Sequence, residues 1–205
     1  MTLRRESAVH VPEDVDPVKY APLLCAGATV FNGIRQMSVR AGELVAIQGI
    51  GGLGHLAVQY AAQLGYRVEI PSRGKEKESF ALQLGASSYI DTTDSDGTTE
   101  LQAMGGAALI VTTAPTPEAI TPLTKGLRTS HSGSMLFNEL SIYGWPSGSS
   151  IDSKEAVSFA KHHDINCMVT AYPLLEANKA LADTMAGKAR FRAVLKMQDK
   201  GQKET

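Results

Sequence analysis

Cysteine is scarce in this chain of 205 residues, and its two cysteines, Cys25 and Cys167, cannot build the disulfide framework of a small secreted domain. The N-terminus lacks the basic start and apolar core of a secretory signal. No apolar run reaches the roughly 18 residues that a membrane-spanning helix needs. We therefore expect a protein of a reducing, cytoplasmic compartment that does not span a membrane.

An excess of charge of either sign is also missing. The 20 basic and 21 acidic residues give a formal net charge of -1, and the basic ones are scattered along the chain. Nucleic acids and anionic membranes are bound through clusters of Lys and Arg, so we expect neither as a partner. The length and the hydrophobic share of 43% suffice for one main domain with a small addition.

What the sequence does contain is an alternation of short apolar strands with helices. An irregular arm over residues 1–16 precedes a helical pattern from Pro17 to Met37. The expected strands cover residues 44–48, 67–70, 88–90, 108–112, 140–143, 168–171 and 193–196. The expected helices cover residues 53–64, 75–84, 118–127, 153–163, capped by Asp152 or Ser153, and 174–185. Such alternation predicts an α/β fold with a doubly wound parallel sheet.

A glycine-rich turn, Gly-Ile-Gly-Gly-Leu-Gly, joins the expected strand at residues 44–48 to the helix after it. Gly49 permits a tight turn, Gly51 lets the backbone approach a pyrophosphate, and Gly54 lets the helix pack against the strand. The first amides of the helix and its dipole attract an anion. The turn predicts dinucleotide binding through Gly49, Gly51, Gly52, Leu53 and Gly54. The alternative is a sharp turn without a ligand.

Basic and hydroxyl residues follow the second expected strand, where enzymes that use NAD commonly carry an acidic residue for the ribose hydroxyls. They are Ser72, Arg73, Lys75 and Lys77. A guanidinium can pair bidentately with a ribose 2′-phosphate, which a carboxylate there would repel. The pattern favours NADP(H), with Ser72, Arg73 and Lys77 as contacts. Glu69, which lies within the strand, argues against this preference. The alternative is that the basic residues only form a solvated start of the next helix.

Six segments follow one another between Val11 and Met197: VPEDVDPVKYAPLLCAGATVF, AGELVAIQGIGGLGHLAVQYAAQLGYRV, LGASSYIDT, ELSIYGWPSGS, YPLLEANKAL and FRAVLK. The series resembles the medium-chain, zinc-dependent alcohol dehydrogenases, nearest to the cinnamyl alcohol and yeast-type branch. The resemblance implies a Rossmann-type coenzyme domain over residues 17–166. It also implies that residues 167–205 form a C-terminal appendage of helix and strand, and that the GroES-like catalytic domain is missing.

The resemblance matches Cys25, in PLLCAG, to the last ligand of the family's catalytic zinc. The other ligands belong to the part of the family that this chain lacks, and a catalytic zinc needs about three protein ligands. We therefore expect no zinc, and we interpret Cys25 as a small buried residue left from an ancestral site, with a reactive thiol or a metal ligand as the alternative. Surface or packing roles are expected for the histidines, including His55.

After Leu127 the family places a strand of the type Gly-x-Val-Val-x-Val-Gly, whose loop approaches the nicotinamide ring. RTSHSG stands there in this chain, so the sheet is expected to be one strand short. The strand at residues 140–143 would then pair with residues 108–112, because a buried strand edge needs hydrogen-bond partners. The nicotinamide side of the pocket would be altered.

Three functions follow from these observations. The first is a zinc-independent NADP(H) oxidoreductase on a small alcohol, aldehyde or ketone, with Cys25, Thr112 and Thr113 as candidate catalytic groups and Thr112 also at the cofactor. The second is non-redox chemistry, as an isomerase, cyclase or dehydratase of a small hydrophobic molecule, in the cleft beside Cys25 and Trp145. The third is a non-catalytic nucleotide-binding scaffold. Under each, the resemblance implies a homodimer joined through the strand region Leu140 to Trp145.

Overall fold

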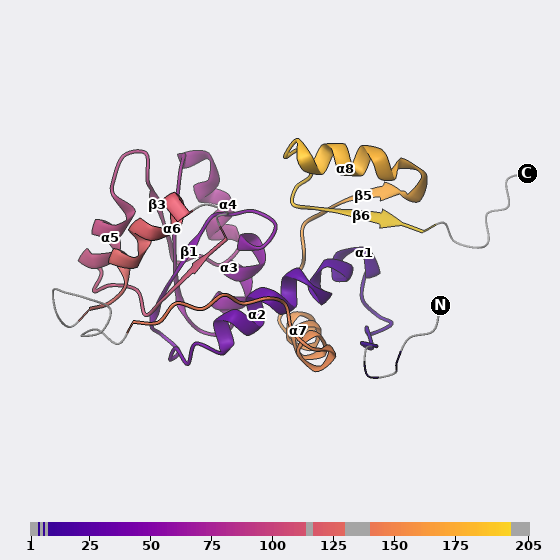
Figure 1. Cartoon of the computed structure of the whole chain (residues 1–205), viewed down its shortest axis with the longest axis horizontal. Helices are drawn as coiled ribbons and strands as arrows, with labels where there is room; N and C mark the ends of the chain where they lie inside the picture. Colours follow the sequence, from indigo (N-terminus) through magenta and orange to yellow (C-terminus); the bar gives the residue numbers. More distant parts are fainter. Residues whose placement is uncertain (1–3, 5, 7, 114–116, 130–139, 198–205) are drawn as a thin grey trace, which may run out of the picture. The chain divides into compact units, whose positions relative to one another are not determined.

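The computed structural model describes residues 4, 6, 8–113, 117–129 and 140–197, and the chain divides into two compact units (Figure 1). The sheet unit is continuous and covers residues 29–147, while the terminal unit joins residues 1–28 to residues 148–205. The domain borders that we expect from the sequence fall elsewhere, after residues 16 and 166, and they stay a prediction.

The sheet unit is built on a parallel sheet of four strands in the order β3-β2-β1-β4. The strands are β1 (Leu44–Gln48), β2 (Arg67–Ser72), β3 (Ser88–Asp91) and β4 (Leu109–Thr112). Val45 of β1 lies opposite Val68 of β2 on one side and Leu109 of β4 on the other. The predicted α/β class with a Rossmann-type parallel sheet is confirmed.

Helices cover both faces of this sheet, with α3 and α4 on one side and α5 and α6 on the other (Figure 1). The helical segments are α2 (Ala26–Arg35), α3 (Gly54–Gln63), η3 (Lys75–Lys77), α4 (Glu78–Gln83), α5 (Gly97–Ala103), α6 (Pro117–Ile120) and η4 (Thr121–Gly126). The first residues of α2 belong to the terminal unit. The sequence pattern missed α5, and the helices expected at 75–84 and 118–127 each begin or end as a 3-10 segment.

The core of the sheet unit lies on both faces of β1. Leu44 and Ala46 pack in one cluster with Ile90, Leu101 of α5 and Ala107. On α3, the side chains of Leu56 and Tyr60 are fully buried. Burying one such side chain stabilises a fold by about 1.5–3 kcal/mol, so the central strand and its two helical layers hold the carboxyl end of β1 in place.

The terminal unit contains a second parallel pair of strands, β5 and β6, with Val169 opposite Arg192. Its segments are α1 (Pro17–Tyr20), η2 (Ala21–Leu24), α7 (Ser150–His162), β5 (Val169–Pro173), η5 (Leu174–Glu176), α8 (Ala177–Met185) and β6 (Arg192–Lys196). The single helix expected from Pro17 to Met37 is wrong, because the backbone leaves the helical conformation at Cys25, with φ -122° and ψ -69°. Within the described residues, no helix is long and apolar enough to cross a bilayer.

Two further expectations are wrong. Helix α7 is capped by Ser149, whose side chain accepts a hydrogen bond from the Asp152 N–H while Asp152 reaches back to the Ser149 N–H, so neither Asp152 nor Ser153 is the cap. Residues 140–149 form no strand, and Ile142 and Tyr143 are 70% and 64% exposed. Alternating apolar residues make a strand only when a neighbouring backbone pairs with them, and β4 pairs with β1 in the described part of the chain. The expected loss of a strand at RTSHSG falls mostly on residues 130–139, outside the described residues.

Candidate functional site

The glycine-rich turn connects the carboxyl end of β1 to the N-terminus of α3. Gly49 has φ +85°, in the left-handed region that a residue with a side chain rarely adopts. A Cβ on Gly54 would lie 1.8 Å from the carbonyl oxygen of Gly49, so the helix and the turn approach more closely than any side chain allows. Gly49 and Gly54 therefore have the conformational roles that the sequence pattern assigns to them.

The middle of the turn is open. A Cβ on Gly51 would meet no atom within 4 Å, and Gly51, Gly52 and Leu53 are all half-buried. Helix α3 has no side-chain cap at Leu53 and no acidic residue in its first turn. Neither a cap nor an acidic residue in its own first turn therefore neutralises the positive end of the α3 dipole, in contrast to α7 with its capping box. Space and charge at this turn fit a diphosphate.

Three neighbouring side chains stabilise the turn through hydrogen bonds. The imidazole of His55 is fully buried and its Nδ1–H donates to the Gly51 carbonyl oxygen at 2.8 Å, which confirms a packing role. Thr113 Oγ1 donates to the Gln48 carbonyl oxygen at 3.1 Å, and Thr112 Oγ1 donates to Gln48 Oε1. The two candidate catalytic threonines therefore lie beside the turn, as expected, and their hydroxyl protons are used to fix it.

The turn also lies where the strand order of the sheet reverses. β1 pairs with β2 on one side and β4 on the other, and the chain reaches β2 through α3 and β4 through α5, on opposite faces (Figure 1). Ligands of open α/β sheets bind at the carboxyl ends of the strands at such a switch point. The topology places Gly49, Gly51 and Thr112 at this edge.

The predicted phosphate contacts in the basic loop after β2 differ in whether their charged groups are already engaged. Lys77 Nζ donates to the Arg73 carbonyl oxygen at 2.8 Å, and Lys75 Nζ lies 3.7 Å from Asp94. Arg73 is exposed, and within the described part of the chain its guanidinium has neither a hydrogen bond nor an ion pair. Ser72 ends β2 and is half-buried. Arg73 is therefore the cation in this loop that is available to an anion, and Lys77 stabilises the loop.

Glu69 does not occupy the position of a ribose-binding carboxylate. Its side chain is buried in β2, three residues before the strand ends, where it accepts a hydrogen bond from Ser88 Oγ and lies 4.0 Å from Arg67. A carboxylate committed to Ser88 and Arg67 in mid-strand does not oppose a phosphate at the strand end. Glu69 therefore does not favour NAD(H).

The two cysteines both belong to the terminal unit and differ in environment. Cys25 is exposed, which overturns the expectation of a buried residue, because the helix is interrupted at this position. It lines a hollow of about 350 Å³ together with Pro22, Arg192 and Leu195. Cys167 is buried, and burial raises the pKa of its thiol to about 11. Trp145, which we expected beside Cys25, belongs to the sheet unit and packs near Gly33.

The described residues do not form a zinc site. Among the described residues, no group of three or more His, Cys, Asp or Glu side chains could hold a metal ion. Cys25 alone does not meet the requirement of about three protein ligands for a catalytic zinc. That the protein works without zinc stays a prediction.

A parallel sheet with a glycine-rich turn at its switch point, at an uncapped helix N-terminus, is typical of the dinucleotide-binding α/β proteins. The fold of this chain belongs to that class. Residues 52–197 match the model of the zinc-binding dehydrogenase family, and the chain belongs to that family. This confirms the resemblance seen in the sequence.

Known relatives agree with this assignment. The chain is 50% identical to the alcohol dehydrogenase patD of Penicillium expansum and 51% identical to the alcohol dehydrogenase notN of an Aspergillus species. Each match covers 95% of this chain and 62% of the relative. The cinnamyl alcohol dehydrogenase SbCAD4 of Sorghum bicolor has a similar structure, with a TM-score of 0.78 and 26% identity over 96% of this chain and 61% of its own. The chain therefore spans about 62% of the length of the two curated relatives.

Proposed function

We propose that this chain binds NADP(H) at the glycine turn and acts as a zinc-independent oxidoreductase on a small alcohol, aldehyde or ketone. The bound nucleotide supplies or accepts the hydride. The family and the two relatives named alcohol dehydrogenase support the reaction class. The observation that carries the proposal is the turn itself, with its open space at Gly51 and the uncapped N-terminus of α3.

Binding would divide the work among the residues at the carboxyl edge of the sheet. The backbone of Gly51, Gly52 and Leu53 would face the diphosphate, with α3 supplying the positive end of its dipole. Thr112 and Thr113 would hold the turn through Gln48. The carbonyl of a substrate would be polarised by the thiol of Cys25, or by the hydroxyl of Thr112 or Thr113 after it gives up its hydrogen bond to Gln48.

The preference for NADP(H) rests on Arg73. Its exposed guanidinium stands directly after β2, and the nearest carboxylate in the strand, Glu69, is engaged elsewhere. A guanidinium can donate two parallel hydrogen bonds to one phosphate, and a hydrogen bond to a charged group contributes about 1.5–3 kcal/mol. Removing this contact would weaken NADPH binding by about 10-fold or more, which follows from 1.4 kcal/mol per factor of ten.

Fluorescence titration of the protein with NADPH and NADH tests both parts of the proposal. We expect saturable binding with NADPH preferred, an Arg73→Glu variant that loses this preference, and an Arg73→Gln variant between the two. Arg40→Glu is the matched control, because Arg40 is also exposed but precedes β1 at the opposite edge of the sheet. Absence of binding for both nucleotides would refute the nucleotide site, and unchanged NADPH affinity in Arg73→Glu would refute the 2′-phosphate contact.

The hollow at Cys25 favours a second candidate, in which a small hydrophobic molecule is isomerised, cyclised or dehydrated without redox chemistry. The hollow is lined by apolar Pro22 and Leu195 as well as by the thiol and Arg192. Turnover of such a compound without added nucleotide, lost in Cys25→Ser, would support it. NADPH binding without turnover of any aldehyde, ketone or alcohol would instead support a nucleotide-binding scaffold.

A further inference from the structure

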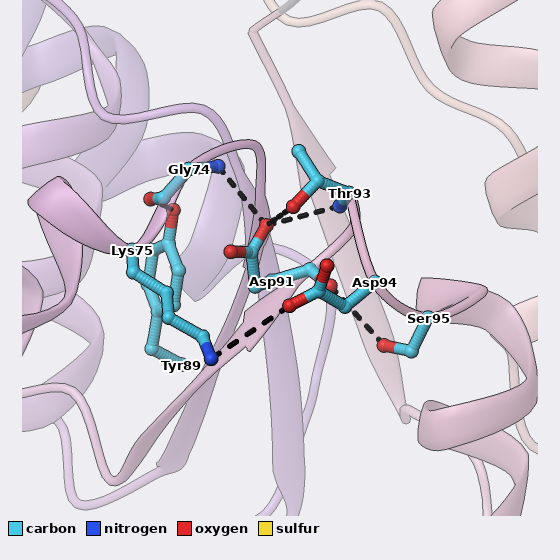
Figure 2. Close-up of polar contacts among 7 residues, drawn as sticks. All are labelled: Gly74, Lys75, Tyr89, Asp91, Thr93, Asp94 and Ser95. Carbon is cyan, nitrogen blue, oxygen red and sulfur yellow. Dashed lines mark hydrogen bonds and ion pairs between the residues drawn. The ribbon is translucent and has the colours of Figure 1, made fainter.

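The loop that carries Arg73 is held from the neighbouring strand by two side chains (Figure 2). The Gly74 N–H donates a hydrogen bond to Asp91 Oδ1 at 3.0 Å, and the Tyr89 hydroxyl donates to the Gly74 carbonyl oxygen at 2.7 Å. Tyr89 and Asp91 lie on β3, which pairs with β2 through Ile70–Tyr89 and Ser72–Asp91. Both polar backbone groups of one glycine are therefore fixed by β3.

These bonds act on the peptide next to Arg73. The Gly74 N–H and the Arg73 carbonyl belong to the same peptide group, and that carbonyl accepts from Lys77 Nζ at 2.8 Å. The peptide is thus held at both ends, by Asp91 on one side and by Lys77 on the other. Gly74 has φ +85°, and a glycine without such bonds has wide conformational freedom. The three contacts therefore restrain the backbone directly after Arg73.

The protonation states of the two side chains suit these bonds. Burial raises the pKa of Tyr89, although a hydrogen bond with the Ser72 side chain opposes that shift, so the phenol keeps its proton and can donate. Hydrogen bonds from the backbone and side chain of Thr93, and then from Gly74, lower the pKa of Asp91, so its carboxylate stays ionised and accepts.

We infer that Tyr89 and Asp91 are positioning residues that orient Arg73 toward a ribose 2′-phosphate and thereby set the preference for NADP(H) over NAD(H). The inference rests on the proposed function. Neither side chain needs to touch the nucleotide, because each acts through Gly74. A loop whose backbone is already fixed loses less conformational entropy when Arg73 binds a phosphate, so releasing the loop weakens the 2′-phosphate contact and leaves the contacts common to both nucleotides unchanged.

The test compares dissociation constants for NADPH and NADH in three variants of the full chain. Tyr89→Phe removes the hydroxyl alone, Asp91→Ala removes the acceptor, and Asp91→Asn keeps an oxygen that can accept from Gly74. We expect Tyr89→Phe and Asp91→Ala to weaken NADPH binding about 3- to 10-fold, the range that corresponds to one hydrogen bond, and Asp91→Asn to restore most of it. NADH binding should change by less than about twofold, because a hydrogen bond that NADH does not use contributes nothing to its affinity.

Matched controls come from the same unit. The hydroxyl of Tyr66 also donates to a backbone carbonyl, that of Val39, and Asp96 also accepts from a nearby N–H, that of Thr98, but neither contacts Gly74. Tyr66→Phe and Asp96→Ala should therefore leave the ratio of the two dissociation constants unchanged, whatever they do to the melting temperature. A purely structural role of Tyr89 and Asp91 would weaken both nucleotides equally, and that result would overturn the inference.

Arg73→Glu, measured in parallel, distinguishes a failure of the positioning role from a failure of the 2′-phosphate contact. If it loses the NADPH preference while Tyr89→Phe and Asp91→Ala keep it, the positioning role is wrong and the proposed function stands. If Arg73→Glu binds NADPH as the unaltered protein does, the 2′-phosphate contact is wrong and the positioning role is refuted with it.

Discussion

At the residue scale, two glycines of the same turn have different physical reasons to be glycine. A Cβ on Gly54 would overlap the Gly49 carbonyl oxygen, whereas a Cβ on Gly51 would point into open space. We expect Gly54→Ala to destabilise the fold by about 1–3 kcal/mol or more, as overpacking does. Gly51→Ala should leave the urea midpoint nearly unchanged and weaken NADPH binding, because its methyl group would stand where the diphosphate approaches.

Urea denaturation and NADPH titration of both variants check this contrast. A Gly51→Ala variant that binds NADPH as tightly as the unaltered protein would show that the diphosphate does not approach the turn at this residue. Gly105→Ala is the control for a glycine with open surroundings that lies away from the turn, although its positive φ adds strain of its own.

The two thiols should differ in reactivity by orders of magnitude. Cys25 is exposed, while the pKa of about 11 leaves Cys167 about 0.1% ionised at pH 8, and the thiolate is the reactive form. We expect iodoacetamide at pH 8 to label one thiol in the folded protein and two in urea. Mass spectrometry of Cys25→Ser should show no rapid label, and rapid labelling of Cys167 would contradict its burial.

At the element scale, the sequence predicted those segments in which burial or a tight turn requires particular residue types. The apolar run Leu44–Gln48 and the glycines after it predicted β1, the turn and the start of α3, because a buried strand and a tight turn each demand particular residue types. Helix α5 was missed, since its seven residues carry one large apolar side chain, Leu101. Its signals were Asp96 as a cap and Gly105 after its end.

Other features could not be predicted because they depend on contacts across the fold. The exposed segment at residues 140–143 has a strand pattern but no pairing partner among the described residues. The hydrogen bonds of Tyr89 and Asp91 to Gly74 join residues that are 15 and 17 positions apart in the sequence. The motif LGASSYIDT showed these residues, but their neighbours follow only from the register of β2 and β3.

The capping box of α7 makes a prediction about this helix. Ser149→Ala removes the side chain that accepts from the Asp152 N–H and should lower the free energy of unfolding by about 0.5–2 kcal/mol. Ser149→Thr keeps the hydroxyl and should recover most of that stability. Urea denaturation followed by circular dichroism measures both, and equal midpoints for Ala and Thr would contradict the cap.

At the scale of the whole molecule, we propose a homodimer formed through the region Leu140 to Trp145. Its support is the exposure of Ile142 and Tyr143, two large apolar side chains that follow one another in the sequence. Light scattering should give twice the monomer mass of 21.8 kDa for the unaltered chain and the monomer mass for Ile142→Lys. Leu82→Lys, at an exposed leucine of α4, is the control that should still form the dimer.

The division of the chain into a continuous and a divided unit sets an order of events during synthesis. Residues 29–147 leave the ribosome together and contain every strand of their own sheet, whereas residues 1–28 must wait for residues 148–205. Because chains grow at about 5–20 residues per second, several seconds pass in which the nascent sheet can fold beside an incomplete neighbour. The sheet unit would thus be able to capture its nucleotide before residues 148–205 have been made.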